Sequence, residues 1–259
     1  MSAAATPGPL VPPQPGPSAD GERGGLRAFE VVLHWVESRI LAGELTVGDQ
    51  LPPERELARQ LDVSRAAVRE AVRTLAAQGV VRSAVGAGAA GGTTVTALPA
   101  RALERFLRLH VALANFPLPD VIEARIALER LSARLAARNA QPDHLVAMRT
   151  ALAVMQTPGV GRAAFNDADT AFHVAIADAA GNRLAADLTV AIRESMRSPL
   201  LVAFHHVADW DGLVEGLRGD HGAIFAAVLG RDADAAERLV ETHIRQAWGR
   251  LAPGLPGAG

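Results

Sequence analysis

A carboxylate and an imidazole lie one helical turn apart in the stretch DTAFHVAIADAAGN, residues 169–182. Asp169 and His173 fall inside an apolar stripe of the predicted helix. The apolar residues of that stripe are Phe165, Phe172, Ile176 and Ala180. An unpaired carboxylate inside a fold is costly unless its pKa shifts. The pair therefore predicts a partner that satisfies both side chains within the core.

Two further histidines share this inward placement. His221 and His243 are each centred on the apolar stripe of their own predicted helix. One inward histidine is most often a satisfied core residue, whereas three histidines and a carboxylate facing one core are better explained by a shared divalent cation. Such a ligand set suits zinc, nickel, iron or manganese better than calcium. The residue pattern alone leaves both interpretations open, a metal site and separate core residues.

The composition excludes several classes of chemistry. The chain of 259 residues contains no cysteine, and all 26 of its basic residues are arginine. Disulfides, zinc ribbons, thiol nucleophiles, a P-loop lysine and a pyridoxal phosphate anchor are therefore excluded. The sequence has neither an apolar run of membrane-spanning length nor a signal-peptide pattern. We therefore expect a cytoplasmic protein with no membrane partner.

The elements that must position these residues form a helical bundle in residues 98–251. Apolar residues recur there at helical spacing, strand-type alternation is absent, and breaks rich in proline and glycine separate the helices. One of these breaks is expected at Ser198-Pro199. The candidate helices are roughly 100–115, 119–139, 142–156, 161–180, 183–203, 210–230 and 232–250. We predict an all-α bundle with its own core, followed by a flexible tail at residues 252–259.

The N-terminal part of the chain has a different organisation. Residues 1–25 are rich in proline and glycine, which predicts a disordered tail. Residues 26–97 show the order helix, helix, tight turn, helix and β-hairpin, with Ser64 as an N-cap and Gly79 as a C-terminal residue of the third helix. This order predicts a winged helix-turn-helix domain, so the fold class is mainly α.

Charge is segregated within this domain. Residues 55–82 carry six arginines against three acids, whereas residues 26–54 carry two arginines against five acids. Arg65, Arg69 and Arg73 follow one another at intervals of four residues beside the apolar face. A basic recognition helix is what a DNA-groove-binding element needs. A small helical domain with solvated arginines would show the same periodicity, so the pattern alone does not decide.

The stretch GELTVGDQLPPERELARQLDVSRAAVREAVRTLAAQGVV closely resembles the N-terminal signature of the GntR family of bacterial transcription regulators. The resemblance implies a homodimer that binds a pseudo-palindrome of double-stranded operator DNA. It also implies DNA contacts from the PxER stretch, the start of the recognition helix and the glycines of the wing. The residues at these positions are Arg55, Ser64, Arg65, Arg69, Gly86 and Gly88. The wing sequence GAGAAGGTTV is longer than the family's usual turn.

The C-terminal half resembles the FCD effector domain of the FadR subfamily. The resemblance rests on EARIALERLSARLAAR, DTAFHVAIADAAGN and GDHGAIFAAVLGRDADAAERLVETHI. It implies that the acid and the three histidines identified above bind zinc, nickel or manganese, and that Arg125 and Asn182 contact a small organic acid. Members that bind acyl-CoA lack this metal set. From spacing alone, Arg125 and Glu129 could form a surface ion pair, and Asn182 could simply end a helix.

The function predicted from these patterns is a ligand-responsive transcription regulator and not an enzyme. One alternative is a regulator that responds to metal without an organic effector. Another is a metal-dependent hydrolase in which the Asp/His cluster activates water. The sequence contains no HExxH motif and no Ser-His-Asp motif. The winged-helix signature argues more strongly against a hydrolase than these absences do.

Overall fold

The structure, a computed structural model, describes residues 27–84, 92–96 and 99–255. The N-terminal tail expected over residues 1–25 lies outside the described residues, and so do Gly86 and Gly88 of the expected wing. Among the described residues, no helix is both long enough and apolar enough to cross a membrane.

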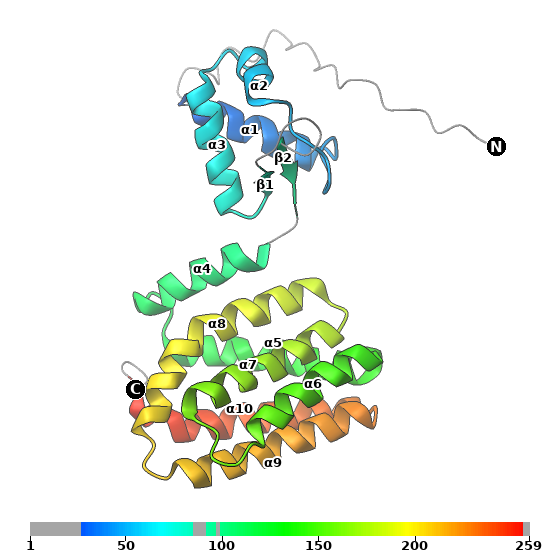
Figure 1. The fold of residues 1–259 in the computed structure, drawn as a ribbon, viewed down its shortest axis with the longest axis vertical. Coiled ribbons are helices and arrows are strands. Elements are labelled where there is room, and N and C mark those ends of the chain that lie inside the picture. The colour runs from blue at the N-terminus through cyan, green and yellow to red at the C-terminus, as the bar shows by residue number, and fades with distance from the viewer. Residues whose placement is uncertain (1–26, 85–91, 97–98, 256–259) are drawn as a thin grey trace, which may run out of the picture. The chain divides into compact units, whose positions relative to one another are not determined.

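The chain divides into two compact units between Ala97 and Leu98. In the first unit, the described residues form helices followed by two paired strands (Figure 1). Its elements are α1 (Ala28–Leu41), α2 (Glu54–Gln60), α3 (Arg65–Ala77), β1 (Val81–Ala84) and β2 (Gly92–Val95). The two strands pair antiparallel, with Val81 opposite Val95. This order of elements confirms the predicted winged helix-turn-helix fold.

Helix α3 begins and ends where its sequence predicts. The hydroxyl of Ser64 accepts a hydrogen bond from the backbone N–H of Ala67 at 3.1 Å, which caps the helix. Gly79 follows the helix with a φ of 74°, a left-handed conformation that glycine adopts without steric cost. The apolar face of α3 packs into a core shared by the whole unit. That core includes Val32, Val36, Leu57, Val68, Leu75 and Val81.

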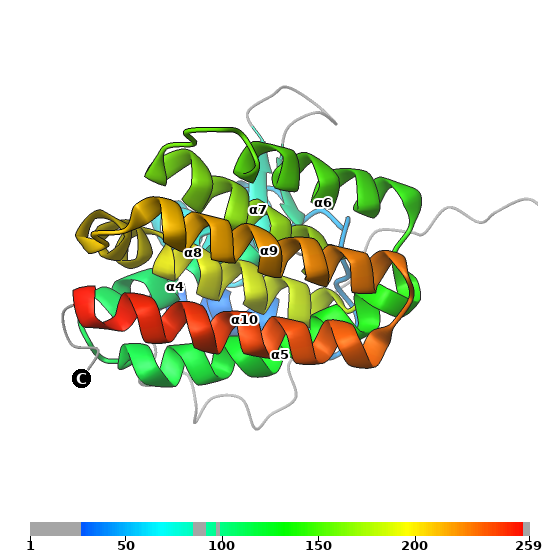
Figure 2. The ribbon, with the colours of Figure 1, turned by 90° about the horizontal axis from the view of Figure 1, so that it is seen from below.

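The described residues of the second unit form a bundle of helices. They are α4 (Pro99–Ala112), α5 (Leu118–Asn139), α6 (Pro142–Met155), α7 (Arg162–Ala179), α8 (Arg183–His206), α9 (Trp210–Leu229) and α10 (Ala233–Leu251). Figures 1 and 2 show that most of them run side by side along one axis. Helix α5 contacts four of the other helices, α7, α8, α9 and α10.

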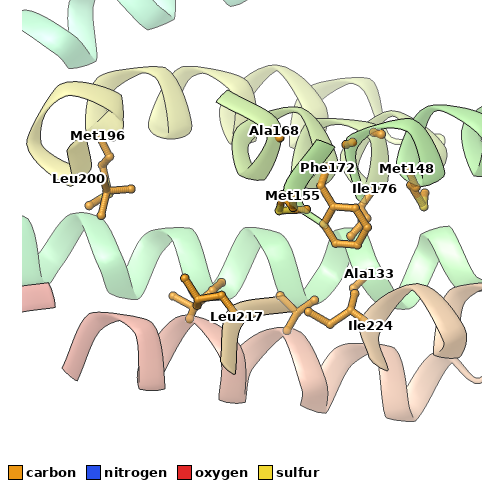
Figure 3. Packing of buried hydrophobic residues seen from close by; sticks show 14 of the residues in the cluster. Ala133, Met148, Met155, Ala168, Phe172, Ile176, Met196, Leu200, Leu217 and Ile224 are labelled. Atoms are coloured by element: carbon orange, nitrogen blue, oxygen red, sulfur yellow. The ribbon is translucent and has the colours of Figure 1, made fainter. Parts of the chain in front are cut away.

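A single apolar core holds this bundle together. Figure 3 shows side chains of α6, α7 and α9 within that core, among them Met148, Phe172 and Ile224. All three are fully buried. The apolar stripes that predicted the helices therefore face one another in the structure, which confirms the all-α fold class of this half.

Two sequence predictions about helix ends differ from the structure. No break occurs at Ser198-Pro199, because α8 continues through Pro199 to His206. Proline lacks an N–H and crowds the preceding turn, which bends a helix without always ending it, and Figure 1 shows α8 bending in its second half. The tail expected from residue 252 instead begins with a 3₁₀ turn, Ala252–Gly254, and Leu255 is buried in the core.

Candidate metal centre and DNA-binding surface

Four polar side chains converge inside the second unit from three different helices. Asp169 and His173 lie one turn apart on α7, His221 lies on α9 and His243 lies on α10. All four are buried, and one ligand atom from each lies within 4.8 Å of the others. The structure thus brings together the four residues that the sequence singled out, in an arrangement where one cation could contact all of them.

The shortest distances join nitrogen and oxygen atoms that are typical metal ligands. His221 Nε2 lies 2.9 Å from Asp169 Oδ1 and 3.3 Å from His173 Nε2. His173 Nε2 lies 3.9 Å from the same carboxylate oxygen. The rings of His221 and His243 have centroids 4.4 Å apart. Three imidazoles and one carboxylate oxygen therefore surround a single small volume.

Two further carboxylates orient the histidines. His173 Nδ1 lies 2.6 Å from Glu129 Oε2, and His243 Nδ1 lies 3.2 Å from Asp220 Oδ2. A neutral imidazole that donates Nδ1–H to a carboxylate keeps Nε2 as an acceptor. Hydrogen bonds of this kind are typical of metal-binding histidines, where they fix the tautomer and ring orientation. The donor set therefore fits a divalent transition metal ion.

His221 is held differently from the other two histidines. Its Nδ1 atom is buried and has no hydrogen-bond partner within the part of the chain that the structure describes. Its ring packs edge-on against Phe172, with centroids 5.1 Å apart. Apolar packing against Phe172 and the contact of Nε2 with Asp169 orient this imidazole, and its Nδ1 has no carboxylate partner of the kind that holds His173 and His243.

Burial keeps the site in the protonation state that binds metal. Desolvation is the main cause that lowers the pKa of His173 to about 3 and the pKa of His243 to about 4. Burial alone would raise the pKa of Asp169, but the charge of Arg193 and the hydrogen bond from His221 hold that pKa well below its usual range. Two neutral imidazoles and an ionised carboxylate are the forms that coordinate metal ions.

Arg193 on α8 is a site residue that the sequence analysis missed. Its side chain is 1% exposed. Its Nη1 donates to Asp169 Oδ2, and its Nε and Nη2 donate to the two oxygens of Glu129, all at 2.7 Å. The sequence pattern that singled out the histidines could also have found Arg193. It is a charged residue in the apolar stripe of its helix, beside Met196 and Leu200.

Arg125 lines a small cavity beside the cluster, together with Asp169 and His243. Its Nε donates to Glu129 Oε1 at 2.8 Å, and both side chains are buried, so this pair is not the surface ion pair that the spacing allowed. The described residues give its Nη1 and Nη2 no hydrogen-bond partner. The free volume of about 20 Å³ has room for about one water molecule.

Asn182 occupies a different position from Arg125. It is exposed and caps α8, where its Oδ1 accepts a hydrogen bond from the backbone N–H of Ala185 at 3.1 Å. It is not among the residues that line the cavity beside the cluster. The structure therefore does not bring the two predicted effector residues together.

The first unit presents unpaired positive charge on its helices. Arg55 on α2 and Arg65 and Arg69 on α3 are exposed, and their side chains make no ion pair or hydrogen bond with the described residues. Ser64 directly precedes α3 and uses its hydroxyl to cap that helix. Arginines without an internal partner remain available to bind phosphates and base edges.

The two units define a class of protein, a winged helix-turn-helix joined to a helical domain with a buried Asp/His cluster. Comparison with known families agrees with this class. Residues 30–90 match the family described as bacterial regulatory proteins, gntR family, and residues 120–246 match the FCD domain. The chain belongs to the GntR family of bacterial regulatory proteins.

Similar proteins include several named regulators. The chain is 30% identical to the Uxu operon transcriptional regulator of Escherichia coli over 232 residues, which is 87% of each chain. It is 30% identical to the transcriptional repressor NanR of Cronobacter sakazakii, covering 83% of this chain and 82% of that one. The structure of Streptococcus agalactiae GntR has the same fold, with a TM-score of 0.53 and 24% identity over 84% of this chain and 98% of that one. The chain is thus a transcription regulator and not an enzyme, as predicted.

Proposed function

We propose that this regulator binds operator DNA as a homodimer and changes its DNA affinity when a small organic acid binds beside a divalent metal ion. The ion is held by Asp169, His173, His221 and His243. The observation that carries this proposal is the convergence of these four buried ligand atoms within 4.8 Å of one another. Nδ1 of two of the three histidines contacts a carboxylate, which supports the assignment.

The formal charges of the site favour an anionic ligand. The buried carboxylates of Glu129 and Asp169 are balanced by the guanidinium groups of Arg125 and Arg193, and the neutral His173 and His243 add no charge. With a divalent cation bound, the site carries two additional positive charges, and the half-buried Asp220 beside His243 offsets one of them. Uncompensated buried charge is costly, so an organic anion stabilises the loaded site.

Arg125 is placed to bind the carboxylate of such a ligand. The Arg125 side chain lines the cavity together with Asp169 and His243, and its Nη1 and Nη2 groups have no hydrogen-bond partner among the described residues. A guanidinium pairs with a carboxylate through two parallel hydrogen bonds. The bound metal ion would supply a Lewis acid for a carboxylate oxygen.

An organic acid is larger than the cavity that is present. The remaining lining is mostly apolar and comes from α5, α8, α9 and α10, including Leu200, Leu217 and Trp248. These helices must move, or their side chains must rotate, to admit the ligand. Because a ligand shifts a conformational equilibrium only through differential binding, this widening couples effector binding to the shape of the bundle.

A binding experiment at fixed salt tests this function. Operator affinity is measured for metal-free protein, for metal-loaded protein, and for metal-loaded protein with each of a panel of small carboxylic acids. We expect an acid to change operator affinity only when metal is present. Arg125→Lys should weaken that response, because lysine keeps the positive charge but cannot form two parallel hydrogen bonds with a carboxylate. If metal alone changes operator affinity, the protein is better explained as a regulator that responds to metal without an organic effector. An acid that acts equally on metal-free protein contradicts the proposal.

The DNA-reading role of α3 is tested separately. Arg65→Ala and Arg69→Ala should each weaken operator binding by about 1–3 kcal/mol, the cost of one bidentate base contact. Arg238→Ala, which removes an exposed arginine from α10, is the matched control. Sedimentation of the complex should give two chains on one inverted repeat, because each winged domain reads one half-site. Wild-type affinity in both folded α3 variants would contradict the assignment.

A further inference from the structure

Arg193 joins the two buried carboxylates that contact the histidine cluster. We propose that Arg193 is a positioning residue that sets the geometry of the metal centre, an inference that rests on the proposed metal binding. The guanidinium group makes three hydrogen bonds of 2.7 Å, one to Asp169 and two to Glu129. Its side chain is buried, so water does not compete for these bonds.

The contact with Asp169 leaves one of its oxygens for the cluster. Oδ2 accepts from Arg193 Nη1, while Oδ1 lies 2.9 Å from His221 Nε2. A carboxylate held in this way cannot rotate freely about its last bond. Arg193 therefore presents a single, oriented oxygen beside the three imidazoles.

The contact with Glu129 acts on His173. Glu129 Oε2 accepts from Arg193 Nη2 at 2.7 Å and from His173 Nδ1 at 2.6 Å. Glu129 Oε1 accepts from Arg193 Nε at 2.7 Å and from Arg125 Nε at 2.8 Å. The orientation of the His173 ring thus depends on Glu129, and the orientation of Glu129 depends on the arginine fork.

Loss of Arg193 would change both charge and geometry, with opposite effects on metal affinity. Removing a positive charge makes the site more negative and favours a cation. Removing the fork lets Asp169 and Glu129 reorient and disfavours a fixed coordination geometry. Arg193→Lys separates the two effects, because lysine keeps the charge but cannot hold two carboxylates with a planar fork.

Arg197 provides a matched control on the same helix. It lies one turn after Arg193 and also joins α8 to α7, through Nη2 at 2.6 Å and Nε at 3.1 Å from Asp167 Oδ1. Its side chain is 45% exposed and makes no contact with the cluster. Arg197→Lys therefore weakens an interhelical ion pair of the same kind without touching the metal centre.

The experiment compares wild type, Arg193→Lys and Arg197→Lys in the full chain. Zinc affinity is measured by competition with a chelator at fixed pH, and the visible absorption of the Co²⁺-loaded proteins reports coordination geometry. Metal-free melting curves check that each variant folds. We expect Arg193→Lys to raise the zinc Kd by roughly 10–100-fold and to alter the Co²⁺ spectrum, while Arg197→Lys changes neither.

Each other outcome overturns the inference in a recognisable way. Wild-type affinity and spectrum in Arg193→Lys would show that positive charge alone is needed. Equal weakening in Arg197→Lys would show a general loss of helix packing. A wild-type protein that binds no metal would remove the proposed function together with this inference.

A measurement on wild type covers the case in which Arg193→Lys fails to fold. ¹⁵N NMR of arginine-labelled protein should show solvent-protected guanidinium N–H signals that persist when zinc is added, because Arg193 is buried and bonded through three nitrogens. A spectrum without protected guanidinium protons would overturn the inference without any variant.

Discussion

Two of the three histidines in the cluster are anchored through Nδ1 by a carboxylate outside it. Glu129 contacts His173, Asp220 contacts His243, and no described side chain bonds to Nδ1 of His221. The carboxylate partners raise the basicity of their imidazoles and fix their tautomers. We therefore expect the two anchored histidines to depend on their carboxylates for metal affinity.

Asp220→Asn tests this dependence at one residue. The amide can still accept from His243 Nδ1 but carries no charge, so the zinc Kd should rise by roughly 10-fold or more. The measurement is a chelator competition at fixed pH. Glu215→Gln on the same helix is the control, because that side chain is 80% exposed. An unchanged Kd in Asp220→Asn would show that the contact does not support a metal site.

Acidification should destabilise the metal-free protein. The pKa values of His173 and His243 are lowered to about 3 and about 4, whereas an unfolded histidine titrates near 6.5. Between these values the unfolded chain binds protons that the folded chain does not. The free energy of unfolding therefore falls as pH falls through this window, by up to about 1.4 kcal/mol per pH unit for each histidine.

Urea unfolding of metal-free protein from about pH 7 to about pH 5 measures this slope. His243→Asn should flatten it, because the variant lacks one of the two groups. A midpoint that does not change over this range would contradict burial of neutral histidines.

The four candidate ligands could be singled out from the sequence, but the hydrogen-bond network around them could not. Asp169 and His221 stand out because an ionisable group inside an apolar stripe is unusual in a helix. Arg193 carried the same signal and could have been found. The partnership of Glu129 with Arg193, 64 residues apart, and the contact of Asp220 with His243 depend on how helices pack. Helical periodicity carries no information about that packing.

At the scale of elements, local chemistry set most helix ends. The predicted helices of the second unit end within three residues of the observed ones, because proline, glycine and capping residues act on their own neighbours. The exception is Pro199. Met196 and Leu200 are buried on either side of it, and we infer that their core packing keeps α8 continuous where proline alone predicts a break.

Ser64→Ala tests the contribution of one cap. Loss of the hydrogen bond to the N–H of Ala67 should destabilise the first unit by about 1 kcal/mol, whereas Ser64→Asn, which can also cap, should stay within a few tenths of wild type. Trp35 lies in the first unit, so its fluorescence reports this unfolding when Trp210 and Trp248 are replaced by phenylalanine. Equal stability of the alanine and asparagine variants would contradict the capping role.

At the scale of the molecule, each unit has its own core, and the cluster lies wholly in the second. A ligand that binds only the folded state stabilises it by mass action. Zinc at about 100 times its Kd should therefore stabilise the helical unit by about 2.7 kcal/mol. The unfolding midpoint of the first unit, measured by the fluorescence of Trp35, should not change. His221→Ala should abolish the shift, and a shift that persists in this variant would place the binding elsewhere.

Metal content tests the central claim most directly. Wild-type protein is purified without a histidine tag or chelator, loaded separately with zinc, nickel and manganese at neutral pH, freed of unbound ions, and analysed for its elements. We predict about one tightly bound ion per chain with at least one of these metals, and its loss in His173→Ala and in His221→Ala. Wild-type protein that retains no ion after any loading, with the four side chains pointing apart in a density map, would contradict the account.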